Sequence, residues 1–187
     1  LNYKPDQSAN GRVTAEVTLT ISEEPYFDMQ LSVNNHSGRV LSKVKFPQRL
    51  KLDRHQIDEA LTPEKPGTIL ESDFFISVLP GQGEYLSPHP PTVADYLAVQ
   101  VQSGNLALYT VWTPGPIRQT VVGFENGQVD TVLFLHDFDM WEANGTTWTS
   151  PPVRIRVSQG FKETVLAYRS DNKLDEYASL QQKLGDK

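Results

Sequence analysis

The stretch Val13–Ile21, which reads VTAEVTLTI, decides the fold class of this sequence. Apolar side chains occupy every second position, and threonine or glutamate stands between them. Successive side chains of an extended strand point to opposite faces, so this pattern predicts a strand with one dry and one wet face. Such a strand is typical of an antiparallel sheet that packs on a second layer.

Similar strands are predicted along most of the chain. One of them stops at Pro47, which cannot donate to a strand ladder, and residues 48–53 could extend it as a short edge. Seven to ten strands with short turns predict an all-β fold, an antiparallel β-sandwich. The other predicted strands are 27–33, 40–46, 97–101, 106–112, 121–124, 129–141 and 153–157, and turn sequences lie at 35–38, 103–104, 126–127 and 144–145.

Two parts of the chain depart from this pattern. The stretch 58–94 holds six of the thirteen prolines, and within it only Thr68–Leu79 has the apolar content to enter a core. The tail changes to helical spacing: Ser158 is predicted to cap one helix and Asp171 a second. We therefore expect a β-sandwich domain over 1–157 and a C-terminal helical connector over 158–187.

Composition excludes several classes of protein. The 187 residues contain no cysteine, so disulfides and thiolate metal sites are excluded. Seventeen Lys and Arg stand against 23 Asp and Glu, a net charge of -6 with no basic patch, so we expect no nucleic-acid partner. No apolar run approaches the length of a membrane span, so no membrane partner is expected. The lack of cysteine suits a reducing cytosol or a bacterial export route, and we favour a secreted or periplasmic location.

The strongest candidate site lies between His136 and Trp148. On an extended strand Asp137, Asp139 and Trp141 share one face, where an indole ring could stack on a sugar beside carboxylate acceptors. The alternative is that the aspartates line a solvated face and the tryptophans belong to the core or its rim. We expect this face to be wet. The candidate carbohydrate-binding residues are Asp137, Asp139, Trp141, Trp148 and Trp112.

No catalytic residue, metal or cofactor is predicted. The four histidines lack metal-site spacing and have no serine in a nucleophile-elbow sequence near them. Two N-glycosylation sequons, at Asn35 and Asn144, lie at predicted turns, so we expect both asparagines to be accessible.

Several short stretches carry a family resemblance. In their order along the chain they resemble the N-terminal β-domain of large multidomain glycoside hydrolases, which is similar to the galactose-mutarotase-like supersandwich. The stretches are Leu31–Gly38, Val44–Pro47, Leu79–Gly81 with Ser87–Pro91, Leu106–Tyr109, Trp148–Pro151 and Ala167–Arg169.

This resemblance implies a supersandwich-like, non-catalytic domain that supports or shapes the substrate cleft of a catalytic (β/α) barrel absent from this sequence. The catalytic carboxylates of those hydrolases belong to the barrel, and the Glu and His of mutarotases align with no position here. The implied partners are a carbohydrate and a neighbouring catalytic domain of the same polypeptide. The alternative is a free-standing carbohydrate-binding or adhesion module, and an autonomous epimerase is the weakest hypothesis because no Glu–His pair suggests itself.

Overall fold

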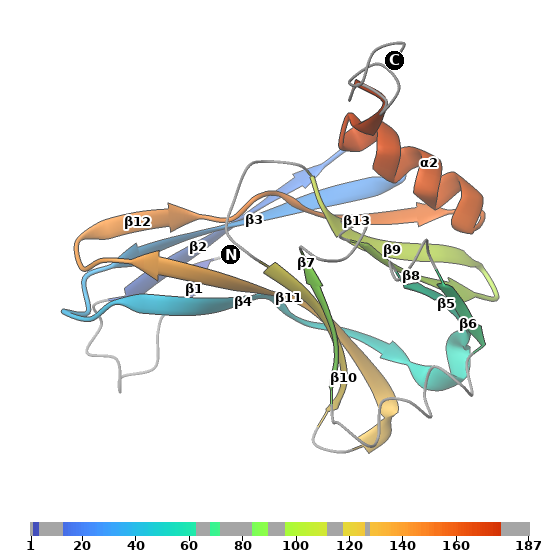
Figure 1. The fold of residues 1–187 in the computed structure, drawn as a ribbon, viewed down its shortest axis with the longest axis horizontal. Coiled ribbons are helices and arrows are strands. Elements are labelled where there is room, and N and C mark those ends of the chain that lie inside the picture. The colour runs from blue at the N-terminus through green and yellow to red at the C-terminus, as the bar shows by residue number, and fades with distance from the viewer. Residues whose placement is uncertain are drawn as a thin grey trace, which may run out of the picture.

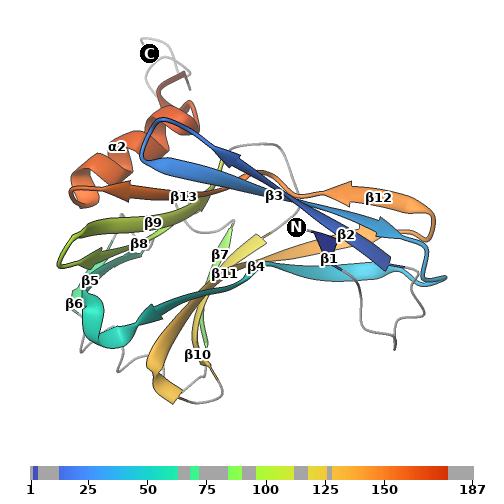
Figure 2. The same cartoon turned by 180° about the vertical axis from the view of Figure 1, so that it is seen from behind.

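The computed structural model describes residues 2–3, 13–62, 68–71, 84–89, 96–111, 118–125 and 128–176. These residues form two antiparallel sheets that face each other, with one α-helix on the outside (Figures 1 and 2). The predicted all-β antiparallel sandwich is thereby confirmed. The elements are β1 Asn2–Tyr3, β2 Val13–Ile21, β3 Tyr26–Asn35, β4 Leu41–Asp53, η2 Arg54–Gln56, β5 Ile57–Thr62, β6 Thr68–Glu71, β7 Glu84–His89, β8 Tyr96–Val101, β9 Gly104–Thr110, β10 Arg118–Glu125, β11 Gln128–Glu142, β12 Thr146–Thr149, β13 Val153–Ser158, α2 Phe161–Asp171 and η3 Leu174–Glu176.

The strand order shows how distant segments meet. In the described residues the large sheet runs β1-β2-β3-β13-β9-β8-β5-β6, and β12 also pairs with β3. The small sheet runs β4-β11-β10-β7. The hairpin predicted around Asn126-Gly127 is confirmed by the pairing of β10 with β11. The hairpin predicted around Ser103-Gly104 is confirmed by the pairing of β8 with β9.

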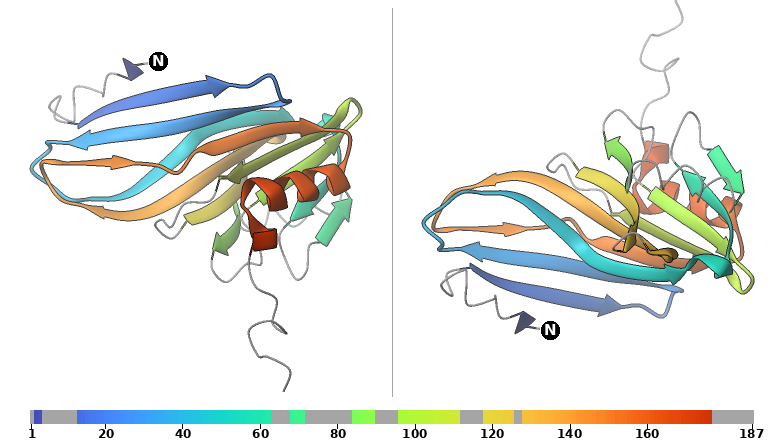
Figure 3. Two further views of the ribbon diagram at one scale, coloured as in Figure 1. Left: turned by 90° about the horizontal axis from the view of Figure 1, so that it is seen from above. Right: turned by 90° about the horizontal axis from the view of Figure 1, so that it is seen from below.

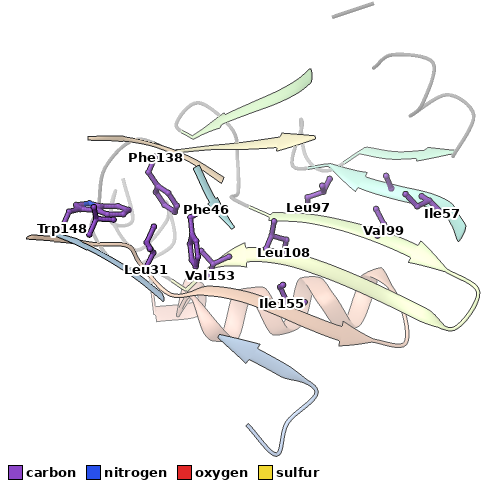
Figure 4. Packing of buried hydrophobic residues seen from close by; sticks show 12 residues of the cluster. Leu31, Phe46, Ile57, Leu97, Val99, Leu108, Phe138, Trp148, Val153 and Ile155 are labelled. Atoms are coloured by element: carbon purple, nitrogen blue, oxygen red, sulfur yellow. The ribbon is translucent and has the colours of Figure 1, made fainter. Parts of the chain in front are cut away.

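The main core lies between the two sheets. Figure 4 shows its side chains, which come from both layers. From the small sheet come Phe46 and Phe138, and their rings pack against the inward face of the large sheet. The buried members are Leu31, Val33, Phe46, Ile57, Ala60, Leu97, Val99, Leu108, Phe138, Trp148, Val153 and Ile155.

The alternating strand β2 is only half covered. Val13, Ala15 and Val17 pack against the core, as the pattern predicts. Leu19 and Ile21 continue the same alternation, but they are 53% and 77% exposed. The dry face predicted for all nine residues therefore extends over only the first half of the strand.

The predicted end of a strand at Pro47 is wrong. Strand β4 continues to Asp53, so the extension over 48–53 is confirmed. Its register with β11 shifts between the pairs His136–Phe46 and Phe134–Leu50, so Pro47 lies in a bulge. Because β4 is also an edge strand of the small sheet, Pro47 can lack a ladder hydrogen bond there.

The stretch 58–94 contains more sheet than its proline content predicts. Besides β6, it holds most of β5 and all of β7. Strand β7 carries Pro88 at the outer edge of the small sheet, where a missing N–H is tolerated. The remainder of the predicted core segment Thr68–Leu79, from residue 72 on, lies outside the described residues.

The described part of the tail forms α2 and the short η3, and α2 packs on the outer face of the large sheet (Figure 3). Tyr168 of α2 contacts Tyr96 and Tyr109, and this second core cluster also contains Leu61, Ala98 and Ala107. Both predicted caps are wrong: the N-cap is Gly160, and Asp171 is the last residue of α2. Residues 177–187 of the predicted second helix lie outside the described residues. The division at 157/158 stays a prediction.

Candidate functional site

Trp141 is the most exposed large apolar side chain among the described residues, at 79%. It lies near the end of β11, where Asp139 is opposite Lys43 but Glu142 is opposite Leu41. Strand β11 therefore holds one more residue than β4 over this interval. Trp141 lies three residues after the buried Phe138, so the alternation of the strand already places its indole on the outer face, at the bulge.

The predicted aspartates occupy positions next to this tryptophan. In the backbone register Asp137 lies opposite Lys45, and Asp139 lies opposite Lys43. Phe138, which alternates with them, is fully buried in the core. The strand therefore places two acidic positions, two exposed lysines of β4 and the exposed Trp141 along one part of the small sheet.

The other two predicted tryptophans do not join this group. Trp148 lies on β12 and is buried between the sheets, with its ring centroid 5.5 Å from that of Phe138. Its ring is part of the core and offers no free face to a sugar (Figure 4). Trp112 lies outside the described residues. Among the described tryptophans, Trp141 alone presents a stacking surface.

Asn35 is enclosed, so the prediction that both sequon asparagines are accessible is wrong. Its Nδ2 donates to the carbonyl oxygens of Arg39, Glu142 and Ala143, at 2.7, 3.1 and 3.2 Å. Its Oδ1 accepts from the backbone N–H and the hydroxyl of Ser37. The amide therefore links the β3–β4 turn to the end of β11. Its nitrogen and its oxygen both hydrogen-bond within the protein, so the side chain is not available to a glycan.

Asn144 remains exposed, as predicted. Its Oδ1 accepts a hydrogen bond from the backbone N–H of Gly38 at 2.8 Å. Gly38 has a φ of 77°, which a glycine adopts without steric cost. The two turns at this end of the sandwich are thus joined to each other.

A polar cluster beneath α2 is the main feature that the sequence analysis missed. Arg154 of β13 donates to both oxygens of Asp28 on β3, at 2.7 and 2.8 Å. Its Nη1 lies 2.8 Å from Oδ2 of Asp171, the last residue of α2. The Arg154 guanidinium also lies over the ring of Tyr26, 3.5 Å from the centroid. The cluster therefore joins two strands to the end of the helix.

Tyr109 completes this cluster from β9. Its hydroxyl donates to Oδ2 of Asp171 at 2.6 Å. Burial and this hydrogen bond to a carboxylate both raise the pKa of Tyr109 well above its usual range, so the phenol stays protonated. Burial alone would lower the pKa of Arg154, but the hydrogen bonds to Asp28 and Asp171 raise it. The tyrosine, arginine and aspartates therefore act as a fixed set of donors and acceptors.

A second arginine lies beside the cluster. Nη1 of Arg156 is 3.9 Å from Oδ2 of Asp171, and its guanidinium is 5.4 Å from the Tyr26 centroid. Its Nε is buried and has no hydrogen-bond partner in the part of the chain that the structure describes. Two arginines and two aspartates balance in charge, and their contacts fix the position of the helix.

The first turns of α2 are held by hydroxyl groups. Thr164 is fully buried, and its Oγ1 donates to Oδ1 of Asn105 at 2.6 Å. The same oxygen is 2.6 Å from the hydroxyl of Ser158. Ser158, which was expected to cap the helix, thus bonds to a side chain of the helix. Together with the charged cluster, these contacts attach both ends of α2 to the sheet.

The remaining features of the described residues give no further site. They contain no group of three or more acidic or histidine side chains arranged to hold a metal ion. No helix among them is long and apolar enough to cross a membrane. No protein-family model matches the sequence, and no curated protein matches it either.

Proposed function

We propose that this chain is a non-catalytic β-sandwich domain of a carbohydrate-active enzyme, a glycoside hydrolase, and that Trp141 contacts the carbohydrate. The single observation that supports this most is the exposure of the Trp141 ring at a β-bulge. A flat apolar ring stacks on the apolar face of a pyranose, and polar groups at its rim take the hydroxyls. Asp139 and Lys43 occupy the neighbouring register positions.

The accessory role rests on the structural use of the buried and half-buried ionisable groups. Arg154, Asp28, Asp171 and Tyr109 bond to one another beneath α2, where they hold the helix. In this proposal the sandwich supports or shapes the substrate cleft of a catalytic (β/α) barrel of the same polypeptide. The family resemblance of the sequence motifs to N-terminal supersandwich domains supports the same assignment.

The test compares Trp141→Ala with Leu166→Ala, a control that removes an exposed apolar side chain from α2. Each purified variant is run in native gels that contain soluble gluco- or galacto-configured polysaccharides. Retardation of the wild type and of the Leu166 variant, lost in the Trp141 variant, supports the proposal. Equal mobility of all three proteins in every polysaccharide contradicts the contact by Trp141.

A free-standing carbohydrate-binding or adhesion module is the alternative. It uses the same exposed Trp141, so polysaccharide binding does not separate the two. The reading frame separates them: alternating strand and helix units of a barrel after Lys187 support the accessory domain. A stop codon at that point supports the free-standing module.

A further inference from the structure

The turn between β11 and β12 carries a glycosylation sequon. Asn144, Gly145 and Thr146 form the sequence Asn-x-Thr, the acceptor of N-linked glycans. The backbone N–H of Thr146 donates to the carbonyl oxygen of Ala143 at 3.3 Å, and Gly145 has a φ of 87°. A positive φ at the third of four residues is the geometry of a type II turn, which places Asn144 at the second position. Asn144 is exposed there, at the end of the sandwich away from α2 (Figure 1).

The side-chain amide of Asn144 has a free nitrogen. Its Oδ1 accepts the hydrogen bond from the backbone N–H of Gly38. Among the described residues, no group accepts from its Nδ2, the atom to which a glycan is attached. Asn35, the other sequon asparagine, donates from its Nδ2 to three carbonyl oxygens inside the fold. The fold therefore leaves Asn144, of the two sequon asparagines, able to carry a sugar.

An exposed aromatic ring lies close to this asparagine. Trp141 precedes Asn144 by three residues, so their Cα atoms are at most about 10 Å apart. The stretch between them is fixed, because the carbonyl oxygens of Glu142 and Ala143 both accept from the Asn35 amide. The indole is 79% exposed. A sugar on Asn144 is therefore within reach of the indole.

The sugar and the indole also match in chemistry. A pyranose such as N-acetylglucosamine has an apolar face of C–H groups, and a flat aromatic ring offers the surface on which that face stacks. Covering an exposed apolar ring is favourable in water. Because the sugar is attached to the same turn, the contact is intramolecular, and the short tether gives the sugar a high effective concentration at the ring.

We propose that Asn144 carries an N-linked glycan whose first N-acetylglucosamine packs on Trp141. The donor is an oligosaccharide joined to a lipid through a diphosphate. The Nδ2 of Asn144 forms a bond to the anomeric carbon of the sugar and loses one proton, while the bond from that carbon to the diphosphate breaks and the lipid diphosphate leaves. The attached sugar covers the ring and so closes it to an external carbohydrate. Only this control of access rests on the proposed function.

The experiment compares the full chain with and without the glycan. The chain is secreted from a eukaryotic cell line behind a signal peptide, and mass spectrometry of its peptides measures occupancy at Asn144 and Asn35. Lectin chromatography isolates the glycosylated form, an endoglycosidase trims the glycan to one N-acetylglucosamine, and bacteria supply the unglycosylated chain. Tm and acrylamide quenching of tryptophan fluorescence are measured for both forms of the wild type, of Trp141→Ala and of Leu166→Ala. The Leu166 variant is the control, because it removes another exposed apolar side chain.

We expect a glycan at Asn144 and none at Asn35 in the secreted chain. The attached sugar should raise the Tm of the wild type and of the Leu166 variant by about 2–4 °C, with a clearly smaller rise in the Trp141 variant. It should also reduce the quenching of the wild type. An unoccupied Asn144, an equal rise in Tm in the Trp141 variant, or unchanged quenching overturns the proposal.

Native gels with polysaccharide separate this proposal from the proposed function. The unglycosylated wild type should be retarded, and the form with one N-acetylglucosamine should not. Retardation of neither form contradicts the proposed function, and the Tm comparison then decides the packing of the attached sugar by itself. Equal retardation of both forms overturns the control of access.

Discussion

Replacing Asp171 by asparagine tests whether the polar cluster holds α2 on the sheet. The carboxylate accepts from the Tyr109 hydroxyl and lies against Arg154, with Arg156 further away. Hydrogen bonds to a charged group contribute about 1.5–3 kcal/mol each. The asparagine amide keeps one oxygen acceptor but removes the negative charge that both Tyr109 and Arg154 contact. We therefore expect the free energy of unfolding to fall by about 2–3 kcal/mol. For a chain of this length that corresponds to a fall of roughly 4–12 °C in Tm.

The control is Asp175→Asn in the neighbouring η3. Asp175 pairs with Arg169, but the two side chains are 67% and 50% exposed. Such surface pairs contribute about 0–1 kcal/mol. Urea unfolding followed by circular dichroism measures both variants. A loss in the Asp171 variant no larger than that in the Asp175 variant would refute the reasoning that the cluster fixes the helix.

Three other changes have defined outcomes. Stability should fall as the pH rises above about 10, because the raised pKa of Tyr109 makes the unfolded chain lose this proton first and bind fewer protons than the folded chain. Urea unfolding of Tyr109→Phe between pH 8 and 11 should show a smaller alkaline decrease. Gly104→Ala should lower the free energy of unfolding by about 1–3 kcal/mol, because its φ is 144° and a Cβ would lie 2.9 Å from the Ser158 carbonyl oxygen. Gly38→Ala, with open space around the glycine, should lower it less in the same assay. Phe138→Ala should cost about 3–5 kcal/mol in thermal unfolding, since its ring is fully buried.

Local patterns predicted the strands that have one wet face. Strand β2 and the turn at Gly38 follow from alternation and from glycine chemistry, both of which are properties of neighbouring residues. Strand β5 was missed for a physical reason. Ala60 faces the main core, whereas Leu61 faces the cluster under α2, so both faces are covered and no alternation results.

The candidate site also combines features that local sequence predicts with features that depend on distant residues. The exposure of Trp141 follows from alternation, as predicted, but the bulge beside it depends on the register with β4, a strand nearly one hundred positions earlier. The prediction for Trp148 was wrong because residue type alone does not separate the two roles: a tryptophan suits a core as well as a sugar site. The bond between Arg154 and Asp28 joins residues 126 positions apart, and no local pattern indicates such a contact.

The contact of Trp141 with a sugar is tested most directly by its own indole N–H resonance. The ¹⁵N-labelled chain is titrated with gluco- and galacto-configured oligosaccharides, and the exposed Trp141 and buried Trp148 signals are followed together. We expect a saturable shift of the Trp141 signal at roughly millimolar affinity, about 4 kcal/mol, with little change at Trp148. An unmoved Trp141 signal at saturating sugar, or unchanged sugar binding in the Trp141→Ala variant, would contradict it.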